Sequence, residues 1–266
     1  MIDLHTHTNF SDGTDSPAQL INKALAAGIS VIGLTDHDSV SGWQEATSAL
    51  RPGISLVPGA EISCQTLDGI SVHILGLLFD SQNVELMKTM EETRENRHGR
   101  MAKIIARINE AGIDITMDDV LEQLADGATL GRPHLADALV ARGVVSSRDQ
   151  AFTEYLHNDS PFYVGHFAPT PEEAITAIKS AGGVSILAHG LAGSRGAIYT
   201  IDEIGELLAH GLDGLEVDHR DHDDAARNEL RELARAFDVY ATGSSDYHGV
   251  VGVQRLGMEL TAPNVW

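Results

Sequence analysis

The stretch SVIGLTDHD, residues 30–38, is an apolar run that stops in three consecutive ionisable side chains, Asp36, His37 and Asp38. Hydrophobic packing does not explain such an ending, because a buried charge is costly unless it is paired or bound to a metal. A short run that is apolar throughout is typical of a parallel strand buried on both faces. The stretch therefore predicts a buried strand with chemically active groups at its carboxyl end.

The same pattern recurs along the chain as short apolar runs that alternate with helical segments. The runs predict strands over Ile2–His5, Ser30–Thr35, Ser55–Ile62, Ser71–Leu78, Val184–Ala188, Gly214–Val217 and Val239–Gly243. Helices are predicted over Pro17–Ala27, Pro171–Ala181, Ile201–His210 and Asp223–Phe237. This alternation predicts an α/β fold, and about seven units favour a closed (β/α) barrel.

The segment from Ser81 to Tyr163 breaks this rhythm, because it contains no convincing strand. A long helix is predicted over Val84–Ala111, and shorter helices over Met117–Ala125, Arg132–Arg142 and Ser147–Leu156. In the long helix an apolar stripe recurs at three- and four-residue spacing, formed by Met101, Ile104, Ile105 and Ile108. We expect a barrel domain over residues 1–80 and 164–266, with residues 81–163 inserted as a helical lid over the barrel mouth.

Histidine and carboxylate side chains lie at or near the ends of six predicted strands: His5, His7, Asp12, His37, Glu61, His73, His189, Asp246 and His248. His5 and His7 are two positions apart on a strand and share a face. Alone, such a pair is weak evidence, and a lone histidine in an apolar strand is more often a core residue. The repetition carries the argument, because the carboxyl ends of parallel barrel strands converge on one mouth. Nine nitrogen and carboxylate ligands without a thiolate predict two or three divalent ions, manganese, iron or zinc.

Composition limits the partners and the compartment. Lys and Arg total 18 against 39 Asp and Glu, which gives a formal net charge of −21. That balance argues against long nucleic acid, which needs a basic surface, but a small phosphorylated substrate is compatible with it. The single cysteine, Cys64, no visible secretory signal and no membrane-spanning apolar run favour a cytoplasmic protein. No segment indicates an obligate protein partner.

Taken in order, the strand-end motifs resemble those of the PHP (polymerase and histidinol phosphatase) family. They are His5-Thr6-His7, Ser11-Asp12-Gly13, Thr35-Asp36-His37-Asp38, Gly59-Ala60-Glu61, His73, Ala188-His189 and Ser245-Asp246-Tyr247-His248. The resemblance covers nearly the whole chain. It is strongest to the stand-alone bacterial branch with a helical lid, which includes 3',5'-nucleoside bisphosphate phosphatases and a short-RNA 5'-exonuclease.

This resemblance implies a distorted seven-stranded barrel with a trinuclear metal site in which manganese is the first choice. It assigns His5, His7, Glu61 and Asp246 to one ion, Asp12, His37 and His248 to a second, and a bridging Glu61 with His73 and His189 to the third. Two positions depart from the family. Asp12 stands where other branches have a histidine, and Gly190 follows His189 where a proline is frequent, opening a glycine-rich loop over Gly190–Gly196.

The lid supplies candidates for substrate binding. Gly131-Arg132-Pro133-His134 opens a predicted helix and resembles the lid motif that holds the phosphate not being hydrolysed. A helix N-terminus with an arginine is suited to an anion. Arg94 and Arg97 resemble a second basic pair, although alternating charges over Glu91–Arg100 are typical of a solvated helix face. The run His219–Asp224 is interpreted as a helix cap and first turn, and His166 could reach the rim of the pocket.

The expected reaction is hydrolysis of a phosphate monoester, in first place the 3'-phosphate of a nucleoside bisphosphate, by a hydroxide that bridges the metals. Asp246 could accept the proton of the attacking water, and His189, Asp36 or His134 could protonate the leaving group. Asp36 and Asp38 could instead orient neighbouring ligands. The alternatives are a 5'-3' exonuclease on short RNA, a cyclic phosphodiesterase or a histidinol-phosphate-type monoesterase, and a PHP module without catalytic activity.

Overall fold

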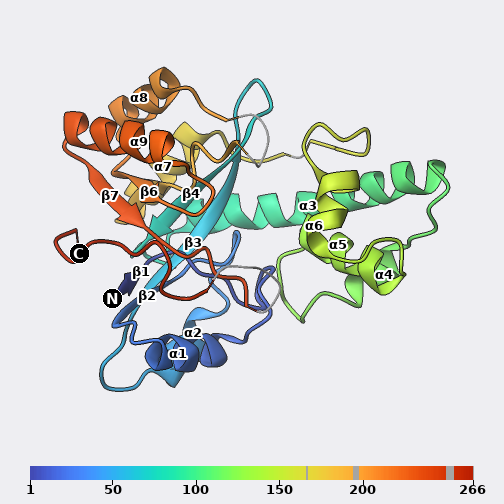
Figure 1. The fold of residues 1–266 in the computed structure, drawn as a ribbon, viewed down its shortest axis with the longest axis horizontal. Coiled ribbons are helices and arrows are strands. Elements are labelled where there is room, and N and C mark those ends of the chain that lie inside the picture. Colours follow the sequence, from blue (N-terminus) through green and yellow to red (C-terminus); the bar gives the residue numbers. More distant parts are fainter. Residues whose placement is uncertain (166, 194–197, 250–254, 266) are drawn as a thin grey trace.

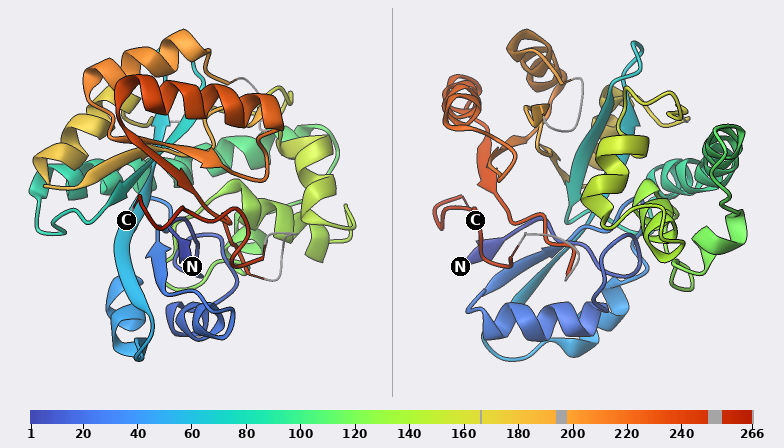
Figure 2. Two further views of the ribbon diagram at one scale, coloured as in Figure 1. Left: turned by 60° about the vertical axis from the view of Figure 1, so that its left-hand side comes forward. Right: turned by 45° about the vertical axis from the view of Figure 1, so that its right-hand side comes forward.

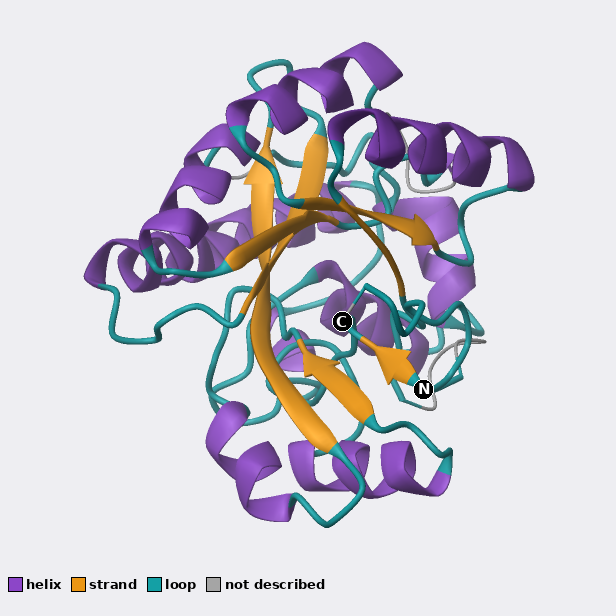
Figure 3. Cartoon of the chain, turned by 90° about the vertical axis from the view of Figure 1, so that its left-hand side faces the viewer, coloured by secondary structure: helices purple, strands orange, loops and turns teal. Residues whose placement is uncertain are grey.

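Seven strands form one sheet that curls into a nearly closed barrel (Figure 1, Figure 3). The computed structural model describes residues 1–165, 167–193, 198–249 and 255–265. The strands pair in sequence order: β1 (Ile2–Asp3), β2 (Val31–Leu34), β3 (Ser55–Gln65), β4 (Ser71–Leu77), β5 (Val184–Leu187), β6 (Gly214–Asp218) and β7 (Tyr240–Gly243). A single parallel bridge, Thr6 to Tyr247, links the segments that follow β1 and β7. The predicted barrel with seven strands is therefore confirmed.

The prediction of parallel strands was wrong for β4, which runs antiparallel to both β3 and β5. A tight turn from Thr66 to Ile70 reverses the chain, and the Thr66 amide donates to the Ile70 carbonyl at 2.9 Å. Strand β3 runs past the barrel mouth, so β4 begins at that mouth and descends. His73 near the start of β4 therefore faces the same end of the barrel as Glu61 of β3.

Alternation along the strands separates the barrel interior from the surface under the helices. In β3, Val57 belongs to an interior cluster with Leu75 and Leu77 of β4. Ala60 and Ile62, on the opposite face of β3, belong to the cluster beneath the outer helices. Because side chains alternate between faces, Glu61 points to the interior, on the same side as Val57.

Helices cover the outside of the barrel (Figure 3). They are α1 (Pro17–Ala26), α2 (Trp43–Ala49), α7 (Pro171–Ser180), α8 (Ile201–His210) and α9 (Asp224–Phe237). Helix α2 was not among the predicted helices. Ser16, Thr170 and Thr200 cap α1, α7 and α8, each with a side-chain oxygen that accepts the backbone N–H three residues on. These caps start the helices where the strand-to-helix turns end.

The segment between β4 and α7 forms a separate helical layer on one side of the barrel (Figure 1, Figure 2). Its elements are α3 (Val84–Glu110), α4 (Met117–Leu121), α5 (Arg132–Ala141), α6 (Arg148–Ala151) and a π-helix, η1 (Phe152–Leu156). It has its own hydrophobic cluster around Ile104, Ile108 and Leu135. Leu86 and Met90 at the start of α3 instead join the barrel cluster, so this helix connects the two layers. The two-domain boundaries themselves stay a prediction.

Among the described residues, no helix is both long enough and apolar enough to cross a membrane.

Candidate metal centre

The segment after β1 brings the first candidate ligands into the barrel mouth. His5 and His7 are fully buried, and their Nε2 atoms lie 3.0 Å apart. The loop that follows folds back and places Asp12 beside His7, with 3.6 Å between Asp12 Oδ1 and His7 Nδ1. This turn needs glycine at position 13. A Cβ atom there would lie 2.7 Å from the His7 carbonyl oxygen, which is closer than the two atoms can approach. The histidine pair and the loop carboxylate thus form one unit.

Glu61 of β3 lies at the centre of the cluster. Its Oε2 atom is 3.3 Å from His5 Nε2, 3.2 Å from His7 Nε2 and 3.0 Å from His37 Nδ1. Its Oε1 atom is 2.7 Å from His73 Nδ1 and 3.0 Å from His189 Nε2. One buried carboxylate therefore faces five imidazoles, as a ligand that bridges two or more ions would.

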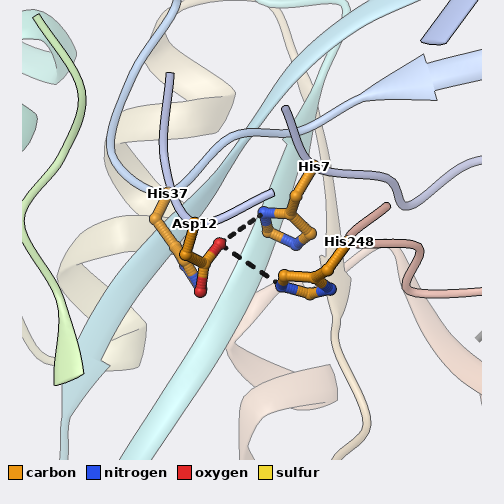
Figure 4. A group of neighbouring side chains, drawn as sticks. All are labelled: His7, Asp12, His37 and His248. Carbon is orange, nitrogen blue, oxygen red and sulfur yellow. Dashed lines mark ion pairs between the residues drawn. The ribbon is translucent and has the colours of Figure 1, made fainter. Parts of the chain in front are cut away.

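A second group gathers around Asp12 (Figure 4). Asp12 Oδ1 lies 3.3 Å from His248 Nε2, and Asp12 Oδ2 lies 3.6 Å from His37 Nε2. The rings of His7 and His248 stack, with their centroids 4.1 Å apart. Segments that follow β1, β2 and β7 are thus brought together at one point.

Asp246 and His189 follow β7 and β5. Asp246 Oδ1 is 3.5 Å from His5 Nε2 and 3.4 Å from His7 Nε2. The φ angles of Asp246 and His189 are 49° and 35°, in the left-handed region that non-glycine residues rarely adopt. Such strain is held by the surrounding structure and concentrates at functional sites.

The electrostatics of the cluster are those of a cation site. Burial opposes the charged form of Glu61, but the imidazoles of His73, His37 and His5 outweigh it and hold the pKa of this carboxyl well below its usual range. Burial lowers the pKa of His7, yet hydrogen bonding to Asp246 and Glu61 raises it to about 10. The carboxylates thus stay ionised and compete for positive charge.

The residues fit divalent metal ions. Three groups have ligand atoms within 4.8 Å of one another: His5, His7 and Glu61; His7, Asp12, His37 and His248; and His37, Glu61 and His73. In the described part of the chain, the buried atoms Asp12 Oδ1, His37 Nδ1 and His73 Nδ1 have no hydrogen-bond partner, as is expected of atoms that await an ion. The nine predicted ligands all lie in or beside these groups.

The predicted sets differ from the observed groups in detail. His7 lies within reach of both the Glu61 group and the Asp12 group. His37 joins Glu61 and His73, whereas His189 contacts this group through Glu61. Which ion each side chain binds therefore stays a prediction.

A cavity of about 740 Å³ opens onto the cluster and is bordered by the lid. Arg132 and Pro133 at the start of α5 line it, as do Arg97, Arg100 and Arg148 from the lid and Arg220 from the barrel side. Five of the chain's 18 basic residues therefore surround one cavity, although the net charge of the chain is −21.

The predicted substrate-binding residues occupy different positions. Arg132 lines the cavity, and its Nη1 donates to the Leu156 carbonyl at 2.6 Å and to Asn158 Oδ1 at 2.8 Å. Arg97 also lines it, but its Nη2 is bound to Asp38 Oδ2 at 2.8 Å and to Ser63 Oγ at 2.6 Å. Arg97 therefore joins the lid to the barrel.

Arg94 and His134 lie outside the described lining of the cavity. Arg94 pairs with Glu91 at 3.2 Å on the outer part of α3. His134 is buried, and its Nδ1 accepts the Gly131 N–H at 3.1 Å, so it caps α5. The predicted roles of both residues in substrate binding therefore stay predictions.

Asp36 is a buried anchor for the loop that follows His7. Oδ1 accepts the Thr8 N–H at 2.7 Å and the Ser11 hydroxyl at 2.6 Å, and Oδ2 accepts the Thr8 hydroxyl at 2.6 Å. Asp36 does not border the cavity described above, so this geometry favours the orienting role over a catalytic one.

Several residues at the site escaped the sequence analysis. Arg148 pairs with Asp137 and donates to the Asp12 carbonyl at 3.3 Å, so α6 contacts the metal loop directly. The run His219–Asp224 is more than a helix cap: Asp223 does cap α9, but His219 is completely buried and its Nε2 lies 3.4 Å from Asp246 Oδ2. Only the tertiary contact distinguishes it from a solvated loop. His166 and residues 194–196 of the glycine-rich loop lie outside the described residues.

The chain matches one family model and is similar over most of its length to several known proteins. A family model for the PHP domain matches residues 3–139. The chain is 35% identical over 260 residues to a 5'-3' exoribonuclease from Haemophilus influenzae, covering 97% of this chain and 93% of the relative. It is 32% identical over 248 residues to a 3',5'-nucleoside bisphosphate phosphatase from Chromobacterium violaceum, covering 93% and 87%. A structure from Bifidobacterium adolescentis, described as a metal-dependent phosphoesterase, superposes with a TM-score of 0.94 at 38% identity, covering 99% of this chain and 93% of that one.

Proposed function

The chain belongs to the PHP domain family and is a metal-dependent phosphoesterase, and from this premise we propose that it hydrolyses the 3'-phosphate of a 3',5'-nucleoside bisphosphate. One observation carries the proposal. One cavity is lined both by residues of the imidazole and carboxylate cluster and by half-buried arginines of the lid, and we infer from this two separate seats for phosphate. A nucleoside that carries two phosphates matches both seats.

The ligands proposed for two or three divalent ions are His5, His7, Asp12, His37, Glu61, His73, His189, Asp246 and His248. Manganese is the first choice, with iron or zinc as alternatives, because the donors are nitrogen and oxygen without sulfur. When bound, such ions supply Lewis acidity that acidifies water and offsets the charge developing on the phosphoryl group.

The chain's own residues would direct the proton transfers. Asp246 Oδ1 faces the His5 and His7 Nε2 atoms, and we assign to it the proton that the attacking water loses. His189 borders the cavity, whereas Asp36 and His134 are occupied as a loop anchor and a helix cap. Of the three candidates for protonating the leaving 3'-oxygen, His189 is thus the one we retain.

The second phosphate is proposed to bind Arg132 and Arg100. Within the described residues, neither guanidinium has a carboxylate within ion-pair distance, and the hydrogen bonds of Arg132 come from Nη1 alone, which leaves Nε and Nη2 without one. Burial and the neighbouring charges of Arg132 and Arg97 lower the pKa of Arg100 to about 9. Both arginines are half-buried, so a positive charge without a counterion is costly there, and a phosphate dianion would reduce that cost.

The nucleoside would lie between these two seats, against Phe152 of η1. Phe152 lines the cavity beside Leu156, and the Arg132 guanidinium lies 5.8 Å from the centroid of its ring. An aromatic face supports any base by stacking, so this seat selects for a nucleoside without selecting a particular base. A π-helix frequently marks such functional positions.

The proposed partner is therefore a small nucleotide, and no membrane, long nucleic acid or obligate protein partner is part of the proposal. We also propose a cytoplasmic location, which the free, buried thiol of Cys64 fits.

The test is phosphate release by the manganese-loaded protein from 3'-phosphoadenosine 5'-phosphate, with adenosine 3'-phosphate and adenosine 5'-phosphate as matched monophosphates. Fast, chelator-sensitive release from the bisphosphate and release at least ten times slower from both monophosphates is expected. Equal release from all three would retain the phosphoesterase and refute the second phosphate seat.

A second candidate is 5'-3' exonuclease activity on short RNA, which the Haemophilus influenzae relative favours. The lining of the cavity also includes Arg220 after β6, a further cation for the backbone of a short RNA. Two- to five-residue RNA with a 5'-phosphate in the same assay separates the two candidates. Faster turnover of this RNA than of the bisphosphate would favour the exonuclease.

A further inference from the structure

Among the seven described strands, only β6 has none of the proposed ligands at or near its end. Two buried ionisable groups nevertheless lie there. Glu216 and His219 are 1% and 0% exposed. Neither is part of the described lining of the cavity, so neither is placed to touch a substrate. Each lies beside one of the proposed ligands, Glu216 beside His5 and His219 beside Asp246.

Glu216 fixes His5. Glu216 Oε1 lies 3.1 Å from His5 Nδ1, and the Ser244 hydroxyl donates to the same oxygen. Glu216 Oε2 accepts the backbone N–H of His189 at 2.8 Å. With its Nδ1 proton directed to this carboxylate, His5 presents Nε2 to Glu61 and Asp246.

His219 has one possible neutral tautomer in this setting. Its Nδ1 accepts the Asp221 backbone N–H at 3.1 Å, so the ring proton resides on Nε2. That atom is buried, 3.4 Å from Asp246 Oδ2, and makes no hydrogen bond of regular geometry within the described residues. Asp246 Oδ1 meanwhile faces His5 and His7. The Asp246 carboxylate thus lies between the metal cluster and the His219 ring.

We propose that Glu216 and His219 are positioning residues for the metal centre. Glu216 orients the ring of His5 through Nδ1, and the Nε2–H of His219 orients Asp246 Oδ2, so that Asp246 Oδ1 stays directed at the Nε2 atoms of His5 and His7, where an ion would bind. The inference rests on the proposed metal centre. The backbone of Asp246 gives it a physical reason: at a φ of 49° the residue needs contacts beyond its own chain preference to stay in place.

The test compares the manganese affinity of chelator-treated wild type with that of His219→Ala, His219→Gln and Glu216→Gln, by competition with a chromophoric chelator. Loss of such outer partners typically weakens metal binding about 10- to 100-fold, so His219→Ala and Glu216→Gln are each expected to raise one manganese Kd by that factor. His219→Gln should recover most of the affinity, because its amide N–H can replace Nε2. Thermal unfolding of the metal-free proteins verifies that each variant folds.

His222 provides the matched control, because it is buried beside His219 but binds the Leu191 N–H and the Val217 carbonyl instead of Asp246. His222→Ala should therefore leave manganese affinity at the wild-type value. Unchanged affinity in His219→Ala would overturn the inference while leaving the metal centre intact. Loss of one whole ion in both His219 variants would also overturn it, because His219 would then be a ligand. A wild type that binds no manganese would overturn this inference and the proposed function together.

Discussion

Arg132→Ala is expected to remove the preference for a bisphosphate while leaving the metal chemistry in place. Within the described residues, Nε and Nη2 of Arg132 make no hydrogen bond, so they can grip one phosphate as a pair. A hydrogen bond to a charged group contributes about 1.5–3 kcal/mol, and we take about 2–4 kcal/mol for the partly exposed pair. This predicts a fall of about 30- to 900-fold in kcat/KM for 3'-phosphoadenosine 5'-phosphate.

The assay measures kcat/KM for the bisphosphate and for adenosine 3'-phosphate, which lacks the second phosphate, with manganese in excess. Turnover of the monophosphate should change little in Arg132→Ala. Arg132→Lys keeps the charge without the planar fork and should lie between wild type and alanine. Arg94→Ala is the control on the same lid, because Arg94 pairs with Glu91 outside the cavity lining, and it should match wild type. Equal losses on both substrates, or no loss on either, would show that Arg132 does not bind the second phosphate.

Three further predictions follow from named contacts. Phe152→Ala should raise KM for the bisphosphate by about 5- to 150-fold, since stacking on an aromatic ring contributes about 1–3 kcal/mol; an unchanged KM would remove the nucleoside seat. Arg97→Met should lower the free energy of unfolding by about 3–5 kcal/mol, because it leaves Asp38 buried without its cation. In urea titrations Arg97→Met with Asp38→Asn should be more stable than Arg97→Met alone, and a double variant no more stable would contradict this. The pKa of Asp213 is lowered, because hydrogen bonds from Ser185 and Lys179 outweigh burial. Its stabilising effect is therefore complete above about pH 4 and is lost as pH falls below that value, so the cost of Asp213→Asn should shrink at low pH; a pH-independent cost would argue against it.

The candidate ligands could be found from the sequence because each interrupts or ends an apolar run, and their convergence follows from barrel geometry. The direction of β4 could not be obtained in this way, because an apolar strand with one histidine has the same pattern in either direction. The signal that was overlooked is Asp68-Gly69 between two predicted strands, which is typical of a hairpin turn. Gly69 has a φ of 87° in that turn.

The roles of charged residues away from strand ends depend on tertiary contacts that no local pattern records. Arg94 and Arg97 belong to one charged run, yet only Arg97 is buried and reaches Asp38. His219 lies in an acidic segment before a helix, where a solvated cap is the usual interpretation, and its contact with Asp246 comes from a segment 27 residues further along the chain. The convergence of the candidate ligands was therefore predictable, whereas the residues that contact them from other segments required the fold.

If the cluster around Glu61 holds the metal ions of a phosphoesterase, anomalous diffraction at the manganese edge, from crystals of the protein grown with manganese, should locate them there. We expect two or three anomalous peaks in contact with Glu61 or Asp12, each within bonding distance of at least three of the nine proposed ligands. If no peak lies in this cluster, with manganese bound elsewhere or not at all, the cluster is not the metal centre.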